Sequence, residues 1–209
     1  MATACAKLNA VLSSYIDGGE LNTTDLRQHL KGISPEQALQ LLGTVRDSHQ
    51  GTVIHVAAER DDVELLTCFL DSLNADQLCE LVFVQDANGS TALHHIARSG
   101  NIKVVTHICS AITSEQRYEL LRIQDKIGYA PLHAAAKTGQ SDLITSILES
   151  INPAQQSEIL AIVDNSKRTA FDIAMLENHQ STADLLKQCE FKAKSQTVSD
   201  SAKGEKIFC

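Results

Sequence analysis

An internal repeat is the feature that most limits what this chain can fold into. Three similar segments, LNADQLCELVFVQD, ITSEQRYELLRIQD and INPAQQSEILAIVD, place Asn74, Thr113 and Asn152 at equal spacing, since 74, 113 and 152 differ in steps of 39. Four aspartates recur with the same period, namely Asp47, Asp86, Asp125 and Asp164. An internal repeat of this length indicates a stack of similar units, each of which buries its apolar face against the next.

The four units that begin at these aspartates share one plan. They read DSHQGTVIHVAAERDDVELLTCFL, DANGSTALHHIARSGNIKVVTHIC, DKIGYAPLHAAAKTGQSDLITSIL and DNSKRTAFDIAMLENHQSTADLLK. Turn-forming residues such as Asn88 and Gly89 come first, and a Thr cap or Pro131 then starts an Ala-rich helix. A loop around Gly100 or Gly139 precedes a second helix whose apolar residues follow helical spacing. The pattern therefore predicts a turn and two helices in every unit.

The segments near residues 74, 113 and 152 predict a third short helix in each unit. Each has Asn or Thr followed three residues later by Gln, as in a capping box, and the pairs are Asn74 and Gln77, Thr113 and Gln116, and Asn152 and Gln155. A helix of about 10 residues is marginal alone, so it must pack on its neighbours. A fourth box, Ser34 and Gln37, is one residue out of register. It indicates a degenerate repeat in residues 1–46, preceded by helices around residues 5–16 and 24–30.

The runs GTVIHVAA, GSTALHHIA and GYAPLHAAAKTG resemble the TPLHxAA signature of ankyrin repeats, a family whose usual unit of about 33 residues contains a β-turn and two helices. The sequence departs from this signature at Asp61, Ala130, Asp172 and Met175. The resemblance implies an all-α fold, an ankyrin-type repeat solenoid with three helices per repeat. It would comprise an N-terminal helical cap (1–46) and four repeats (47–189) that start at residues 47, 86, 125 and 164. The weaker signature of the last unit is expected for a terminal repeat that faces water.

The C-terminal segment 190–209 differs in composition from the repeats. The text KAKSQTVSDSAKGEK has no periodicity and almost no large apolar residue, which predicts a disordered tail over 190–209. The final residues Ile207, Phe208 and Cys209 leave two alternatives open. They resemble a carboxy-terminal type IV secretion signal, and they also resemble a PDZ ligand. In either case the protein would be an adaptor or a secreted bacterial effector that is targeted through this tail.

The charge balance limits the classes of partner. A net charge of −8 and a pI near 5.4 oppose binding to phosphate backbones and to anionic lipid. No segment approaches the roughly 18 apolar residues of a membrane-spanning helix. We therefore expect a cytoplasmic monomer, or a protein of the host cytoplasm if it is a secreted effector, that binds no nucleic acid and does not insert into a membrane.

The sequence favours neither metal binding nor catalysis. His55, His94 and His133 recur with the same period as the aspartates, and the family resemblance implies that each bonds to turn backbone, with one histidine in each layer. They would then lie too far apart to share a zinc ion, whose ligands lie at about 2 Å. Cys109 and His107 are two residues apart on a predicted helix and so do not face each other. Phosphate-binding, dinucleotide-binding and HExxH motifs are missing from the sequence, and we predict no catalytic residue, no metal and no cofactor.

The resemblance implies that partner proteins bind in a concave groove lined by the turn tips and by exposed positions of the first helix in each repeat. Carried over position by position, the candidate partner-binding residues are His49, Glu59, Arg60, Asn88, Ser90, Arg98, Lys126, Ile127, Tyr129, Lys137, Thr138, Arg168 and Glu177. An exposed Tyr129 beside Ile127 and Arg98 would suit a binding hot spot. Arg98 and Lys137 favour an acidic peptide as the partner. Packing of Tyr129 against its own turn is the alternative.

Overall fold

The computed structural model describes the backbone of residues 2–204 and the side chains of residues 5–196. Within these residues the regular structure is α-helical, apart from two isolated antiparallel bridges, Arg46–Thr52 and Gln85–Thr91. The prediction of an all-helical fold is confirmed. The helices are α1 (Ala2–Ile16), α2 (Thr23–Lys31), α3 (Pro35–Thr44), α4 (Val53–Glu59), α5 (Val63–Asp71), α6 (Ala75–Val82), α7 (Ala92–Ser99), α8 (Ile102–Ala111), α9 (Ser114–Arg122), α10 (Pro131–Lys137), α11 (Ser141–Glu149), α12 (Pro153–Leu160), α13 (Ala170–Leu176) and α14 (Gln180–Gly204).

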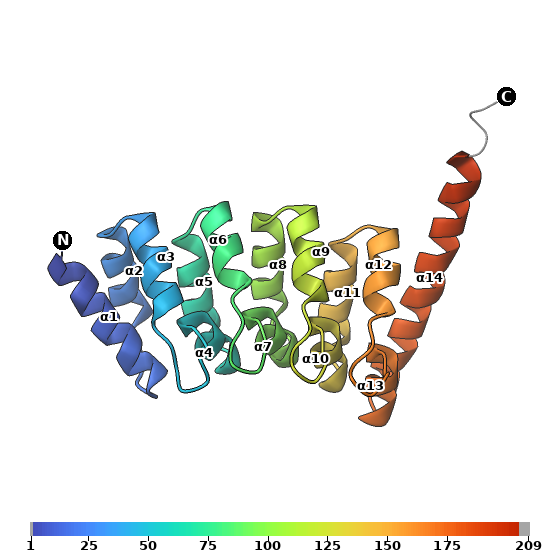
Figure 1. Ribbon diagram of the computed structural model, residues 1–209, viewed down its shortest axis with the longest axis horizontal. Coiled ribbons are helices and arrows are strands. Elements are labelled where there is room, and N and C mark those ends of the chain that lie inside the picture. Colours follow the sequence, from blue (N-terminus) through green and yellow to red (C-terminus); the bar gives the residue numbers. More distant parts are fainter. Residues whose placement is uncertain (1, 205–209) are drawn as a thin grey trace.

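The helices lie side by side in a row that runs from one terminus to the other (Figure 1). Helices α4, α7, α10 and α13 follow the lower edge of this view, where the turns project, and α3, α6, α9 and α12 follow the upper edge. Along the lower edge each helix packs on the next, and α5, α8 and α11 pack on one another in the same way. Segments that are one repeat period apart in the sequence therefore become neighbours in space.

The core between these helices is aliphatic, as the low aromatic content predicts. Equivalent positions on α5, α8 and α11 carry Leu65, Val104 and Leu143, whose exposed fractions are 0%, 0% and 1%. On the lower-edge helices Ala57 and Ala135 are fully buried, and their small side chains allow neighbouring helices to approach closely. Burial of large aliphatic side chains stabilises the row by about 1.5–3 kcal/mol for each side chain.

The predicted third helices are present as α6, α9 and α12, and each begins with the predicted capping box. In α9, for example, Thr113 Oγ1 accepts from the Gln116 amide at 3.2 Å, and the Thr113 amide donates to Gln116 Oε1 at 2.9 Å. The same two bonds start α3, α6 and α12.

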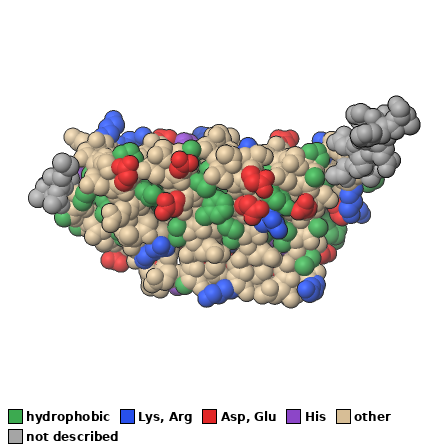
Figure 2. All heavy atoms as spheres, turned by 45° about the horizontal axis from the view of Figure 1, so that its top comes forward, with side chains coloured by type: hydrophobic (Ala, Val, Ile, Leu, Met, Phe, Trp, Pro, Cys, Tyr) green, Lys and Arg blue, Asp and Glu red, His purple; other side chains and the backbone are tan. Residues whose placement is uncertain are grey.

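On the face shown in Figure 2, acidic, basic and hydrophobic side chains are interspersed, without a broad patch of one kind.

The N-terminal helices contact the first unit through Arg60. Its Nη1 donates to the Tyr15 carbonyl at 2.7 Å near the end of α1, and its guanidinium lies over the Tyr15 ring at 4.5 Å. The Tyr15 hydroxyl donates to Asp62 at 3.3 Å. Burial, together with the Asp62 charge, raises the pKa of Tyr15 to about 12. A cation at the carboxyl end of a helix is favourable, so Arg60 stabilises the attachment of α1.

The prediction of a disordered tail from residue 190 is wrong for residues 190–204, because α14 continues as one helix to Gly204. Lys194 pairs with Glu190 at 2.6 Å one turn earlier, and Ala193 is fully buried. Helical propensity and one buried contact thus extend a helix that is anchored on α12 and α13. Residues 205–209, with the suggested secretion or PDZ signal, lie outside the described residues.

No helix in the described part of the chain has the length and apolarity needed to cross a membrane.

Candidate functional site

The turn tips between the upper and lower helices are built around the four repeated aspartates. Asp125 Oδ1 accepts from the backbone amides of Ile127 at 3.0 Å and Tyr129 at 2.8 Å. The same pair of bonds, from the second and fourth residues that follow, occurs at Asp47, Asp86 and Asp164. Each aspartate therefore fixes the shape of its own tip.

Neighbouring tips are also joined to one another by backbone hydrogen bonds. The Lys126 amide donates to the Asn88 carbonyl at 2.8 Å, and the Asn165 amide donates to the Ile127 carbonyl at 3.1 Å. At the first junction the Ala87 amide donates to a carbonyl of the preceding tip at 2.6 Å. The four tips thus form a continuous row in which a backbone hydrogen bond recurs at every junction.

The repeated histidines bond to turn backbone, as expected from the sequence, and they also tie each unit to the next tip. His94 Nδ1 accepts from the Thr91 amide at 3.0 Å, which leaves Nε2 to donate to the Tyr129 carbonyl at 3.0 Å. His55 and His133 make equivalent bonds, to the carbonyls of Ser90 and Arg168. Burial lowers the pKa of His55 and of His94 to about 4 and also lowers the pKa of His133. These imidazoles are neutral near pH 7.

Tyr129 is not the exposed anchor that the sequence suggests. Its side chain is only 8% exposed, and its ring stacks on His133 with centroids 5.6 Å apart. Lys137 Nζ lies 5.8 Å from the centre of the same ring. The alternative interpretation, in which Tyr129 packs against its own turn, is therefore correct, because the ring fills the space beside a structural histidine.

Other predicted residues are also engaged in the scaffold. Ser90 is 4% exposed, and Thr138 donates its hydroxyl to the Arg98 carbonyl at 2.9 Å. Arg168 pairs with Asp164 at 2.7 Å, and Asp164 raises the pKa of this guanidinium. Together with Arg60, which holds α1, these side chains are less available to a partner than their sequence positions suggest.

The remaining predicted residues are exposed, namely His49, Glu59, Asn88, Arg98, Lys126, Ile127, Lys137 and Glu177. Among them Ile127 is the large apolar residue, and 56% of its surface is exposed. Four of these residues, Arg98, Lys126, Ile127 and Lys137, belong to the second and third units, and we refer to them as the cationic ridge. The structure thus brings three predicted cations and one exposed apolar side chain to the tips and helix ends of adjacent units.

The first two tips enclose a polar pocket that includes a residue missed by the sequence analysis. His95 Nε2 lies 3.3 Å from Asp86 Oδ2, and its Nδ1 is buried without a hydrogen-bond partner among the described residues. His49, Glu59 and Asn88 line the same pocket of about 110 Å³. A signal was available in the sequence, because His95 stands where the other units have only apolar residues, namely Val56, Ala134 and Ile173.

Four of the cysteines, Cys68, Cys79, Cys109 and Cys189, do not resemble activated nucleophiles. Burial raises the pKa of the Cys109 thiol, and it does the same for Cys68, Cys79 and Cys189. His107, which is close to Cys109 in sequence, instead lies 3.6 Å from Asp71. Since the thiolate is the reactive form, these surroundings disfavour reaction at neutral pH. Within the described residues, no three His, Cys, Asp or Glu side chains are placed to hold a metal ion.

Comparison with known proteins gives no family assignment. No protein-family model matches the chain, and no curated protein matches it either.

Proposed function

We propose that this chain is an ankyrin-type repeat solenoid that binds a partner protein, without catalysis, through its turn tips and first helices. The repeat period, the ankyrin-like signature, the repeated capping boxes and the row of bonded tips support this proposal. A repeat array suits such a role because each layer contacts only its neighbours, so exposed positions can change without a new core. The inference from architecture to binding is an analogy with the family.

The observation that carries the proposal is the cationic ridge. Arg98 and Lys126 are exposed, and their side chains form no hydrogen bond or ion pair with any other described residue. Lys126 is the sequence neighbour of the exposed Ile127 on the third tip, and Arg98 lies in the last turn of α7 in the adjacent unit, whereas Arg168 on the fourth tip is neutralised by Asp164. Exposed cations next to an apolar side chain, on a backbone held by the neighbouring tips, favour binding over structural support.

The ridge favours an acidic segment as the partner. The chain as a whole is acidic, so a local group of cations attracts an acidic partner to one place and repels basic competitors. Ile127 would supply the apolar contact that surface charges alone rarely provide, because exposed ion pairs contribute only about 0–1 kcal/mol each. Binding that depends on these cations should weaken as ionic strength rises.

Affinity capture with a charge-reversed ridge tests the proposal. The variant carries Arg98→Glu and Lys137→Glu, and the matched control carries Lys103→Glu and Lys187→Glu, two exposed cations outside the ridge. We expect the first variant to lose specific partners that the wild type and the control retain, with a melting temperature within about 3 °C of the wild type. Capture of the same partners by all three proteins would refute the proposal. Tyr129 is left intact because its substitution would disturb the core.

A further inference from the structure

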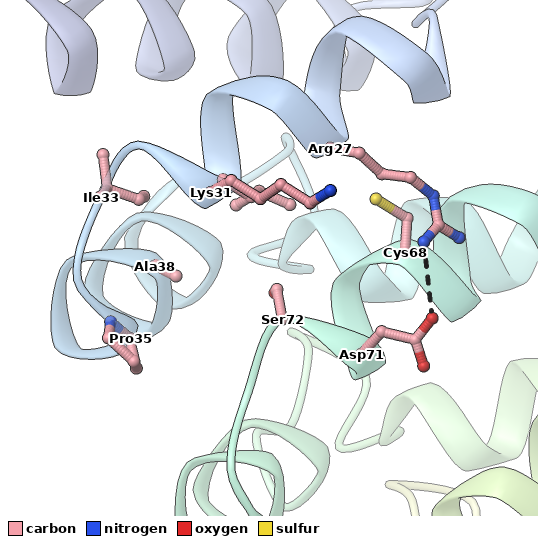
Figure 3. A pocket seen from close by; sticks show the side chains of 9 residues that line it. Arg27, Lys31, Ile33, Pro35, Ala38, Cys68, Asp71 and Ser72 are labelled. Atoms are coloured by element: carbon pink, nitrogen blue, oxygen red, sulfur yellow. Dashed lines mark ion pairs between the residues drawn. The ribbon is translucent and has the colours of Figure 1, made fainter.

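A second pocket lies far from the cationic ridge in sequence, at the junction of α2, α3 and α5. Its volume is about 220 Å³. Figure 3 shows Lys31 and the Cys68 thiol pointing into the space between the helices, with the Arg27 side chain beside Cys68 and its ion pair to Asp71 marked. The lining consists of Arg27, Leu30, Lys31, Ile33, Pro35, Ala38, Cys68, Asp71 and Ser72. The pocket therefore combines an apolar interior with a charged rim.

The pocket exists because two of its residues are smaller than their counterparts in the next unit. Cys68 corresponds to His107, one repeat period later. Ala38 corresponds to Leu78, one position beyond the repeat period, which matches the one-residue offset of the first capping box. Ala38 and Cys68 are each 2% exposed, so they form the floor. In the next unit Leu78 is 1% exposed, so a larger side chain is buried at the position equivalent to Ala38.

The charges at the rim are not balanced. Arg27 and Asp71 lie 3.6 Å apart, with about half of each side chain exposed, and Asp71 also lies 3.6 Å from His107. Lys31 is exposed and pairs with no described residue. Burial raises the pKa of Cys68, so the thiol is neutral. An apolar pocket with one unpaired ammonium group is complementary to an apolar group that carries a carboxylate beside it.

We propose that this pocket is a second binding site, which receives an aromatic side chain from an acidic segment of a partner protein. The ring would enter between Lys31, Ile33 and Pro35, above the floor formed by Ala38 and Cys68, and an adjacent carboxylate would pair with Lys31. A cavity of about 150 Å³ with apolar walls holds benzene, so the volume here suffices for one aromatic side chain. This site does not depend on the cationic ridge, and either can fail without the other.

The test uses defined peptides and the intact chain labelled with nitrogen-15. The probe is acetyl-EEFEE-amide, and its matched controls are acetyl-EEAEE-amide, which lacks the ring, and acetyl-KKFKK-amide, which reverses the charge. We expect EEFEE to shift the amide signals of the pocket-lining residues in a saturable manner. Loss of the ring should weaken binding about tenfold or more, and charge reversal of the peptide should weaken it about fivefold.

Three variants locate the site. Ala38→Leu fills the floor as Leu78 does in the next unit, Lys31→Glu reverses the unpaired charge, and Lys187→Glu is the distant control. The first two should reduce EEFEE affinity about fivefold or more, and the control should leave it unchanged. If Ala38→Leu unfolds the chain, the exposed Lys31→Glu variant provides the same test.

Several outcomes would overturn this inference. One is the absence of shifts at the pocket at a peptide concentration of about 5 mM, which corresponds to negligible affinity. Equal binding of EEAEE would remove the role of the ring. Binding of decanoate at the pocket without binding of EEFEE would assign the site to a lipid, and shifts that depend on protein concentration alone would assign it to a second copy of this chain.

Discussion

Acidification should destabilise this fold through its buried histidines well before the carboxylates titrate. Burial lowers the pKa of His55 and His94 from 6.5 to about 4. Between pH 4 and pH 6.5 these two histidines bind protons in the unfolded chain but stay neutral in the folded state. The stabilising contribution of the neutral imidazoles is therefore complete above pH 6.5 and is lost as the pH falls from 6.5 toward 4.

The size of this effect follows from the two pKa values. Each unit of difference corresponds to about 1.4 kcal/mol of free energy, and the interval from pH 7 to pH 5 covers most of the titration of the unfolded histidines. The free energy of unfolding should fall by about 2 kcal/mol per histidine, or roughly 4 kcal/mol for the two together. His133, whose pKa is also lowered by burial, adds to this loss. A domain of ordinary stability has a free energy of unfolding of about 5–15 kcal/mol, so it would lose a large share of that free energy.

Urea denaturation at pH 7, 6 and 5 measures the effect, and the pH 5 limit keeps carboxylates with ordinary pKa values ionised. The control is the double variant His55→Gln and His94→Gln, since Gln at this position of a capping box still accepts from the cap amide. This variant should be less stable at pH 7 but should lose the pH dependence due to these two residues. An unfolding free energy that changes by less than about 1 kcal/mol between pH 7 and 5 would refute the reasoning, and so would an equal change in the double variant.

Two further predictions concern backbone positions, and a third concerns a helix cap. Gly128 has a φ of +84°, and an added Cβ would lie 2.6 Å from the Asn165 amide nitrogen, so Gly128→Ala should cost about 2 kcal/mol or more in urea denaturation; an unchanged midpoint would show that the tips are not tightly stacked. Lys167 occupies the equivalent position with a φ of +64°. The substitution Lys167→Gly should therefore raise the free energy of unfolding by up to about 1 kcal/mol, and a decrease would contradict this. Thr113→Ala should cost about 1 kcal/mol by removing the α9 cap, whereas Ser114→Ala, one residue later and exposed, serves as a control with little effect.

The sequence predicts the helices well where the signal is local. The box formed by Asn74 and Gln77 specifies a helix start through two hydrogen bonds between residues three apart, and both bonds are present. The positive φ at Asp61 shows the limit of residue type as a signal, because this position, equivalent to Gly100, adopts the same turn without glycine. Periodicity therefore predicted the conformation better than the identity of the residue.

The candidate site was less predictable because exposure depends on several segments at once. Tyr129 sits on a tip, where family analogy suggests an exposed side chain, yet its ring packs on His133. Arg60 belongs to the expected groove, but α1 packs beside it, and Arg60 caps that helix. The pocket at Ala38 is lined by small residues from separate segments. The spacing of residues along any one segment does not reveal such a pocket. In each case the deciding neighbour lies more than three residues away in sequence or on another unit.

The bonding of the tips separates what the fold requires from what a partner can contact. His49, Asn88 and Ile127 occupy equivalent positions, and their backbone carbonyls accept the same hydrogen bond from the next tip. Their side chains have nothing in common, because the fold uses only the backbone at this position. Asp125 and its equivalents, in contrast, are the same residue in all four units, since the carboxylate itself bonds to the tip. A position whose side chain varies on an invariant backbone is where binding specificity can change without loss of stability, and the proposed ridge lies at such positions.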